Sequence, residues 1–564
     1  MGMKNFDDIF DHIGGFGLYQ FGLFTVTCYI NTLMSFTYFG QMFMSLTPPH
    51  WCSPPPEFTS ANLTNEEIKK LTIPINENGE YHKCKRYDIN FTEEFDLHKN
   101  IGNDTSWPTT TCDHGITYNF SLYYPTITSE LNWVCDEDWK PSFAQSLFFV
   151  GSVFGCQIFG YMADKYGRLP AIVLSNTIGG IAGVASAFAN SFIIFTILRF
   201  IVGMVFDSHL SIIYMLMLEY VSSEYRSVVA NVPIMIFLTL GMVILPWMAI
   251  GLGDWRWLTV IIHFPHCICI LLIWIIPESM RWNISKGNVD NAVKTLKAAA
   301  KVNKKTLSED FIEDFKAYAI SSKEGEKKVT ILDLLKTPNL RKRFILLICM
   351  WLVIQLTYDG HMRNTENIGT NVFITFTMSG LIELPADLVT IFSMDWLGRR
   401  HTTVWSLVLS GVASLIISLF RPDQDMAILV TAMVGRFLIT MAINVGMQYQ
   451  CEVIPTVSRG QGTGAIHTLG FAFSFFSPYI VYLSKFKFWL PYFVMGLLSI
   501  AGGLACLGLP ETLQESLPDT LEDGENAFAQ QPCCYNPFNR KKSKDKTESN
   551  ENGVDNAVYE DSHL

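Results

Sequence analysis

Three acidic side chains interrupt otherwise apolar stretches of the sequence, and carboxylates of this kind can bind a cationic group. Glu383 and Asp387 in "LIELPAD" are four residues apart, so a helix would place both on one face. Asp207 follows Arg199 by eight residues, also on roughly one face, and an internal ion pair with an arginine is the alternative role for Asp207. Because ionisable groups are costly to bury in a membrane, these acids are candidates for a functional site.

Aromatic residues in the same stretches could hold an ammonium group beside these carboxylates. An aromatic face attracts a cation by roughly 0.5 to 2 kcal/mol. Each aromatic residue taken singly is more often a lipid-facing or packing residue. The candidates are Tyr29, Phe36, Tyr38, Tyr214, Trp247, Trp351, Tyr358, Tyr449 and Phe471.

A second group of charged residues recurs in the two halves of the chain. An Asp-x-x-Gly-Arg sequence begins at Asp164 and again at Asp395, 231 residues later, and "PES" at 277 returns as "PET" at 510. The other pairs, at offsets of 233 to 237 residues, are Arg199 with Arg436, Glu219 with Glu452 and Arg226 with Arg459. Several charged signatures in one order at nearly one offset predict two homologous six-helix halves.

These repeated residues are typical of a conformational switch. Gly167 and Gly398 would relieve steric limits in the two turns. The charges around them could form a network between helix ends that is intact in one conformation and broken in another. A single copy would be better explained as a marker of topology, but two copies with matching partners favour a switch. The candidate switch residues are Asp164, Gly167, Arg168, Arg199, Glu219, Arg226, Asp395, Gly398, Arg399, Arg436, Glu452 and Arg459.

The elements that must position these residues are membrane-spanning helices. Of 564 residues, 49% are hydrophobic and 16% charged, whereas a soluble protein carries about a quarter charged residues. A helix needs roughly 20 residues to cross the membrane. In repeated apolar stretches of this length, only a helix satisfies the backbone hydrogen-bonding groups within the lipid. Twelve spans are predicted, near 21–46, 142–163, 171–190, 193–216, 228–250, 257–276, 344–361, 371–394, 402–420, 426–450, 462–484 and 488–509.

The polar segments predict which side of the membrane each faces. Segment 47–140 contains the sequons at Asn62, Asn90, Asn103 and Asn119 and the cysteines Cys52, Cys84, Cys112 and Cys135. This combination predicts a glycosylated extracellular loop with two disulfides, although three connectivities are open and free thiols in a cytosolic loop are the alternative. Segment 277–343 carries fifteen Lys and Arg residues, and segments rich in these residues stay on the cytoplasmic side of the membrane. Because the number of predicted spans is even, both termini are then predicted to be cytoplasmic as well.

These observations divide the chain into four parts. We expect an N-terminal half (1–276), a cytoplasmic connection (277–343), a C-terminal half (344–510) and a disordered cytoplasmic tail (511–564). In the tail, Cys533 and Cys534 beside "RKKSK" could be palmitoylated against membrane lipid, and the ending "DSHL" could bind a PDZ domain. No phosphate-binding G-x-x-x-x-G-K-[ST] sequence occurs, and we expect no enzyme activity, cofactor, metal or nucleic-acid partner.

At the level of motifs, the chain resembles the major facilitator superfamily and, within it, the solute carrier 22 family of organic cation, anion and zwitterion transporters. The motifs that carry this resemblance are "DDIFDHIGGFGLYQ", "PPHWC", "PTITSELNWVCDEDWK", "GYMADKYGR", "DWRW", "PESMRW", "LIELPAD" and "CEVIPTVSRG". The resemblance implies alternating access around a site near the middle of the membrane, between the halves. It also matches Trp351 and Tyr358 to the family's seventh-helix Trp and Tyr, and Glu383 to its eighth-helix acid.

One position departs from the family. An eleventh-helix residue, Asp in many cation carriers and Arg in anion carriers, corresponds to Phe471 here, which leaves the charge preference open. The candidate site holds acids and no Lys or Arg beyond the two repeated arginines. This favours a plasma-membrane carrier of a small amine, quaternary ammonium or zwitterion such as carnitine, a β-amino acid or an amine conjugate. An organic-anion exchanger and a non-transporting receptor or scaffold are the alternatives. The predicted substrate contacts are Trp351, Tyr358, Glu383, Asp207, Phe471, Tyr214, Tyr449, Asp387 and Phe36.

Overall fold

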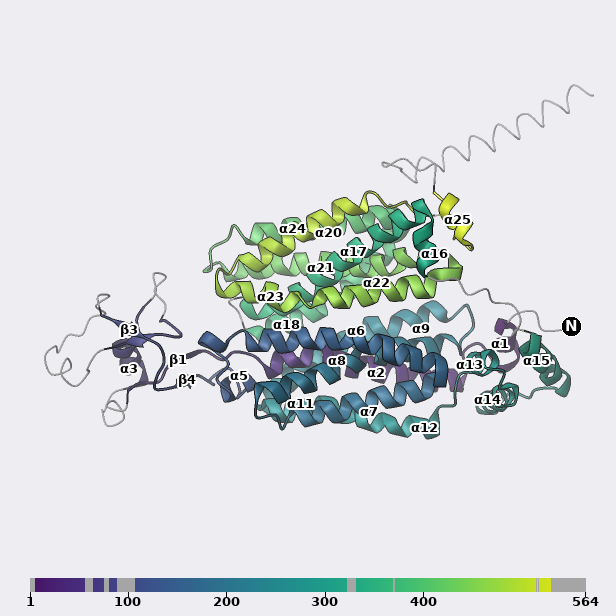
Figure 1. Cartoon of the computed structure of the whole chain (residues 1–564), viewed down its shortest axis with the longest axis horizontal. Coiled ribbons are helices and arrows are strands. Elements are labelled where there is room, and N and C mark those ends of the chain that lie inside the picture. Colours follow the sequence, from purple (N-terminus) through teal and green to yellow (C-terminus); the bar gives the residue numbers. More distant parts are fainter. Residues whose placement is uncertain are drawn as a thin grey trace, which may run out of the picture.

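The computed structural model describes residues 6–55, 64–75, 81–88, 107–321, 331–368, 371–513, 515 and 517–528. Two bundles of long helices lie side by side (Figure 1). The N-terminal bundle contains α2 (Leu18–Met44), α6 (Lys140–Tyr166), α7 (Arg168–Ser186), α8 (Phe192–Leu218), α9 (Arg226–Val232), α10 (Thr239–Leu252) and α11 (Trp255–Ile268). The C-terminal bundle contains α17 (Pro338–Arg363), α18 (Val372–Leu381), α19 (Glu383–Leu397), α20 (Arg399–Ile417), α21 (Asp425–Val453), α22 (Arg459–Ser474), α23 (Ser477–Tyr482) and α24 (Leu490–Cys506).

The described part of the chain agrees with the predicted membrane helices. Ten helices are long and apolar enough to cross a membrane, or eleven if the bent pair Phe6–Ile13 and Leu18–Met44 is one span. Leu490–Cys506 is a shorter apolar helix at the place of the twelfth predicted span. The predicted all-α membrane fold is confirmed, and the helix bounds differ from the predicted ones by a few residues at most ends.

Several predicted spans are interrupted, and prolines explain the interruptions. Pro233 opens a π-helical turn (Pro233–Leu238) between α9 and α10. Pro385 lies just inside α19, where its ring excludes a backbone hydrogen bond to Leu381, so α18 ends there and α19 begins at Glu383. The second of these breaks places the carboxyl-bearing residue Glu383 at the start of a helix within the bundle.

The two ends of the bundle differ, and we name them by what they carry. The loop end carries segment 47–140, with α3 (Asn65–Thr72) and short strands (Figure 1). The terminus end carries α1 (Ile9–Ile13), α13 (Met280–Ser285), α14 (Val289–Val302), α15 (Glu309–Ser321), α16 (Ile331–Lys336) and α25 (Leu521–Asn526). The polar segments therefore lie on opposite ends of the helices, as the sequence predicts.

Two disulfides hold the segment at the loop end. Cys52 joins Cys112 and Cys84 joins Cys135, which selects one of the three possible connectivities. Strand β1 (His50–Cys52) pairs antiparallel with β4 (Ile116–Tyr118), and β2 (Arg86–Tyr87) with β3 (Thr109–Thr110). Of the predicted glycosylation sites, Asn119 is exposed, whereas Asn62, Asn90 and Asn103 lie outside the described residues.

The start of the C-terminal tail is ordered, which corrects the predicted disorder from residue 511. Glu525 in α25 accepts hydrogen bonds from the backbone N–H groups of Asn339 and Leu340, both 2.9 Å, at the start of α17. Arg343 donates to the carbonyls of Gly524 and Ala527, both 2.6 Å. A short polar helix of this kind has no apolar periodicity, and contacts with α17 and with the chain around Pro455 and Thr456 hold it in place. Cys533, Cys534 and the final "DSHL" lie outside the described residues.

Candidate functional site

A buried ionic cluster lies in the middle of the C-terminal bundle. Glu383, 6% exposed at the start of α19, forms an ion pair with Arg436 of α21 and accepts a hydrogen bond from the hydroxyl of Tyr358, 2.9 Å. The Arg436 guanidinium lies 4.0 Å from the centre of the Tyr358 ring and donates to the Tyr358 carbonyl, 2.9 Å. Three helices therefore bring a carboxylate, a guanidinium and an aromatic face into one contact group.

A second acid lies one turn further along α19. Asp387 is half-buried and accepts a hydrogen bond from Asn444 of α21. Its position four residues after Glu383 puts both carboxylates on the face of α19 that packs against α21. Glu383 already has a cationic partner, whereas Asp387 accepts its hydrogen bond from a neutral amide.

Aromatic residues surround this part of the bundle. Trp351 is buried in α17 and stacks on His467 of α22, with ring centroids 4.5 Å apart. Phe471, also in α22, meets Phe206 of the N-terminal half edge-to-face at 5.9 Å. Phe36 and Phe471 both pack against the apolar core that joins the two halves at the loop end.

The structure separates other predicted contacts from this group. Asp207 is buried in α8, and Ser211 donates to it at 3.4 Å, while Arg199 forms no ion pair with it. Tyr214 lies two turns further along α8 and is half-buried. Tyr449 is fully buried at the terminus end, where its hydroxyl donates to the carbonyl of Pro510, so it is not brought to the central group.

A further buried group, which the sequence prediction missed, joins the two halves nearer the loop end. Asp359 and Arg363, one turn apart on α17, form an ion pair of 2.8 Å, and the Tyr38 hydroxyl of α2 donates to Asp359 at 2.7 Å. The predicted span 344–361 ends before Arg363, whereas α17 continues to it and buries both charges. The signal that could have found them is their spacing of four residues with opposite charges.

In the N-terminal half, the predicted switch residues form a network at the terminus end. Arg168 contacts Asp164 at 2.8 Å and Glu219 at 3.7 Å. Glu278 accepts hydrogen bonds from the backbone N–H groups of Arg168 and Leu169, 3.0 and 3.1 Å, and so satisfies the first donors of α7. The hydroxyl of Ser279 donates to Glu219.

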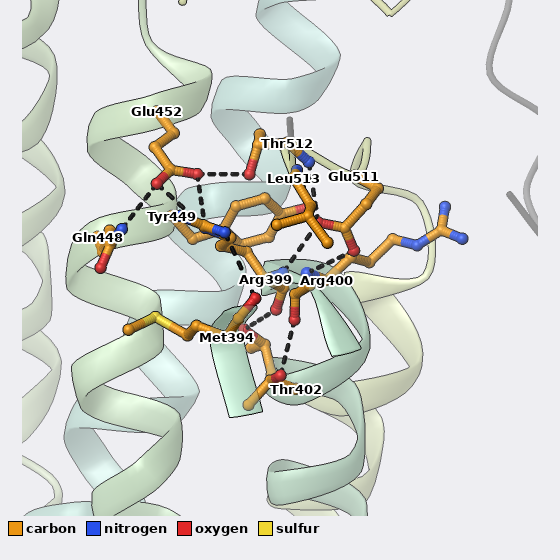
Figure 2. Close-up of polar contacts among 12 residues, drawn as sticks. Met394, Arg399, Arg400, Thr402, Gln448, Tyr449, Glu452, Glu511, Thr512 and Leu513 are labelled. Carbon is orange, nitrogen blue, oxygen red and sulfur yellow. Dashed lines mark hydrogen bonds and ion pairs between the residues drawn. The ribbon is translucent and has the colours of Figure 1, made fainter. Parts of the chain in front are cut away.

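The C-terminal half repeats this arrangement nearly residue for residue (Figure 2). Arg399 contacts Glu452 at 3.1 Å, and Thr512 donates to the same carboxylate at 2.5 Å. Glu511 accepts hydrogen bonds from the backbone N–H groups of Arg399 and Arg400, 2.8 and 3.1 Å. Gly167 and Gly398 both have positive φ, 118° and 84°, and each lies against its capping glutamate.

The two capping glutamates and their neighbouring hydroxyl residues were absent from the predicted switch. Their signal was in the sequence, because the repeat of "PES" and "PET" places Glu278 and Ser279 at the same offset from Glu511 and Thr512 as Glu219 from Glu452. Burial raises the pKa of the Glu219 carboxyl above its usual value of 4.5, and burial likewise raises the pKa of Glu278. Each carboxyl therefore binds a proton more readily than it would in water.

The remaining switch candidates are placed differently. Arg226 contacts Asp7 at 2.6 Å, and Arg459 donates to Thr456 at 3.1 Å, so neither pairs with the glutamate seven residues before it. Asp395 is exposed. Arg436 lies in the central group, and Arg199 donates to Gln41 of α2 at 2.8 Å, so both lie away from the terminus-end networks.

Comparisons with known proteins agree with this architecture. The model of the family "Sugar (and other) transporter" matches residues 90–522. The chain is 33% identical to the Organic cation transporter protein of Drosophila melanogaster over 94% of this chain and 96% of that one. It is 32% identical to the Organic cation/carnitine transporter 2 of Homo sapiens (92% and 94% covered) and 32% identical to the Beta-alanine transporter of Drosophila melanogaster (92% and 89%).

The xylose transporter XylE from E. coli, in a partially occluded inward open conformation, shares the fold with a TM-score of 0.57 at 13% identity, over 88% of this chain and 100% of that one. The chain has two six-helix halves and the repeated networks at the terminus end, and its relatives are more than 30% identical over nearly the whole length. The chain therefore belongs to the solute carrier 22 family of the major facilitator superfamily.

Proposed function

We propose that this chain is a plasma-membrane carrier that moves a small organic cation or zwitterion by alternating access. The observation that supports this most directly is the buried central group, in which Glu383 pairs with Arg436 and accepts a hydrogen bond from Tyr358, with Asp387 one turn further along α19 and Trp351 two turns earlier on α17. An ammonium group would be attracted both by the carboxylates and by the aromatic faces. The names of the relatives, which include organic cation, carnitine and beta-alanine transporters, support the same substrate class.

The central ion pair gives substrate binding a route to conformational change. A bound ammonium group competes with Arg436 for the carboxylate of Glu383, since both are cations within reach of one acid. Displacing Arg436 would also disturb its contact with the Tyr358 carbonyl on α17. A ligand shifts a conformational equilibrium only by its difference in affinity between the states, and this competition supplies such a difference.

We further propose that the loop end is extracellular and the terminus end cytoplasmic. The two disulfides and the exposed sequon asparagine Asn119 favour an oxidising compartment for the loop end. At that end the halves are joined by hydrogen bonds from Tyr38 to Asp359, from Tyr482 to Asp138 and from Ser146 to the Phe475 carbonyl. The described conformation is therefore one in which the outer side of the carrier is closed.

The terminus-end networks are proposed to act as the switch. In each half, the network connects the start of one helix, α7 or α20, to the segment that follows the last helix of that half. It therefore holds in place the helix ends that must move during transport. Asp164→Asn should lower the maximal rate of uptake more than it changes the KM. An unchanged maximal rate at equal surface expression would remove Asp164 from the switch.

The decisive experiment is uptake of radiolabelled probes by cells or proteoliposomes that contain the full-length chain. A panel of an amine, a betaine, a β-amino acid and a dicarboxylate separates the proposed substrates from organic anions. Saturable accumulation of an amine or zwitterion supports the proposal. Preferred accumulation of the dicarboxylate would favour the anion exchanger, and no accumulation of any probe at normal surface expression would favour the receptor or scaffold. Binding of the C-terminal "DSHL" to a PDZ domain, and of the tail to membrane lipid, are separate proposals that rest on sequence alone.

A further inference from the structure

The strongest unexplained feature of the bundle is a pair of arginines whose hydrogen-bonding capacity is only partly used. Arg199 is 0% exposed, and its Nε donates to Gln41, but neither of its Nη atoms has a hydrogen-bond partner among the described residues. Arg363 is 7% exposed, and its Nη2 likewise has no partner in the described part of the chain. The same holds for Nε2 of Gln41.

These donors belong to one group at the contact between the halves. Phe148 and Phe149 are neighbours on α6, with ring centroids 5.7 Å apart. The guanidinium of Arg199 lies 5.5 Å from the ring centre of Phe148, and that of Arg363 lies 5.5 Å from the ring centre of Phe149. Arg363 also lies 5.4 Å from the ring of Tyr38, which shares a face of α2 with Gln41 three residues later.

The charge of this group is unbalanced. Arg363 is neutralised by Asp359, but no described carboxylate forms an ion pair with Arg199. The three charged residues together carry one excess positive charge, in an interior where an uncompensated charge is expensive. A single monovalent anion would neutralise the group and accept the unused hydrogen bonds.

The geometry of the donors favours a planar anion. The two Nη atoms of a guanidinium match the two oxygens of a carboxylate, so Arg199 can bind a carboxylate in a bidentate way, with Gln41 and Arg363 supplying further donors. We infer that Arg199, Arg363 and Gln41 form a subsite for the carboxylate of a zwitterionic substrate. This inference rests on the proposed function, and it narrows the substrate from cations in general to molecules with both an ammonium and a carboxylate group.

The position of the subsite fits such a substrate. Asp359, the partner of Arg363, directly follows Tyr358, the partner of Glu383, so α17 borders both the anion-binding group and the central acidic group. The acidic group would hold the ammonium end of the substrate and the arginines its carboxylate end. The ammonium end would then contact the C-terminal half, and the carboxylate end would contact Arg199 and Gln41 of the N-terminal half as well as Arg363 of the C-terminal half, which would couple occupancy of the site to closure of the halves around it.

The test compares probes that differ only in the carboxylate. Carnitine and its methyl ester, and β-alanine and its methyl ester, keep the ammonium group and remove the negative charge. In full-length carrier, we expect Arg199→Gln, which breaks no ion pair among the described residues, to raise the KM of the acids by on the order of tenfold or more, as for a lost charge-assisted hydrogen bond, and to leave that of the esters nearly unchanged. Arg363→Lys should retain part of the preference for acids. Arg421→Gln, in an exposed loop, is the matched control and should leave the KM of both the acids and the esters unchanged.

The outcomes are distinct. If the variants lose uptake of the acids and of the esters equally, the arginines act in closure of the halves and the subsite is overturned. Equal uptake of the acids and the esters by the wild type would also overturn the subsite. If no probe is taken up at all, the proposed function fails for these substrates, but the subsite is still tested on purified wild-type protein by thermal unfolding. There, sodium acetate should raise the unfolding midpoint more than sodium chloride at equal ionic strength. An equal effect of chloride would indicate an inorganic anion site and overturn the assignment to substrate.

Discussion

At the scale of single residues, the central acid Glu383 has two partners that depend on it. Its carboxylate neutralises Arg436 and accepts the hydroxyl of Tyr358. Removing one partner of a buried ion pair leaves the other charge uncompensated, at a cost of about 3–5 kcal/mol. The role proposed for Glu383 in substrate binding must therefore be separated from its contribution to stability.

We expect Glu383→Gln to impair uptake while the protein still reaches the cell surface, because the amide keeps the shape and the hydrogen bond with Tyr358 but loses the charge. The measurement is uptake of a radiolabelled amine normalised to surface-biotinylated protein. Asp387→Asn is the matched variant, because the partner of Asp387, Asn444, is neutral. Loss of the charge on Asp387 therefore leaves no buried arginine without its ion-pair partner. Unchanged uptake by Glu383→Gln would remove this acid from the substrate site.

Glu219 should make transport sensitive to the pH at the terminus end. Burial raises the pKa of its carboxyl above 4.5, so protonation begins at a higher pH than in the unfolded chain. The contribution of this group to the free energy of unfolding is therefore greatest at low pH and declines as the pH rises through the folded-state pKa. Functionally, protonation removes the charge that attracts Arg168.

The expected result is a rate of uptake that falls as the pH at the terminus end decreases from neutral towards the raised pKa of Glu219, since protonation weakens the proposed switch network. Glu219→Gln should transport slowly at every pH in this range and show a flatter profile. Proteoliposomes with a defined orientation and a controlled internal pH provide the measurement. A Glu219→Gln profile as steep as that of the wild type would show that another group titrates.

At the scale of elements, the turns before α7 and α20 each combine a positive φ with a close capping glutamate. A Cβ atom on Gly167 would lie 2.2 Å from Oε2 of Glu278, and one on Gly398 would lie 2.6 Å from the carboxylate of Glu511. A left-handed backbone costs a non-glycine residue about 1–2 kcal/mol. The collision adds to this cost, because the glutamate must move away from the backbone N–H groups that it caps.

Gly167→Ala should therefore lower the free energy of unfolding by about 2 kcal/mol, whereas Gly160→Ala in α6, where no atom lies within 4 Å of a Cβ, should raise it by up to about 1 kcal/mol. Thermal unfolding of the purified variants measures both. In the background of Glu278→Ala, the cost of Gly167→Ala should become smaller, because the collision is gone. Strictly additive effects of the two substitutions would contradict the close contact.

The same elements show what the sequence could and could not predict. Glu219, Arg168 and their counterparts were predicted because charges repeat at one offset, and that repeat follows from the duplicated fold. Asp359 and Arg363 were missed because they fall at and just beyond the end of the predicted span 344–361, where a charged side chain ordinarily faces water, whereas α17 continues to Arg363 and pairs its charges within the bundle. Tyr449 was proposed as a substrate contact for its residue type, although the predicted span 426–450 already puts it one residue from the end of the helix, where its hydroxyl donates to the carbonyl of Pro510.

At the scale of the whole molecule, the contacts at the loop end determine which conformation is seen. Tyr482 of α23 donates to Asp138 at 2.5 Å, so the start of α6 is joined to the end of the eleventh span across the two halves. Aromatic pairs between Phe39 and Phe376, 5.5 Å apart, and between Phe43 and Phe373, 6.0 Å apart, extend this contact towards the middle. Alternating access requires these contacts to open in every transport cycle.

Covalently joining the halves at this point should stop transport. Asp138→Cys combined with Tyr482→Cys, treated with a short bismaleimide, is expected to lose uptake because the loop end can no longer open, while the probe-binding group in the centre is left intact. A bismaleimide avoids reducing agents, which would also attack the native disulfides Cys52–Cys112 and Cys84–Cys135. Each single cysteine variant, treated in the same way, controls for modification of the native free cysteines and should retain uptake. Full uptake by the cross-linked double variant would show that the two halves do not separate at the loop end, and it would contradict the alternating-access mechanism proposed for this chain.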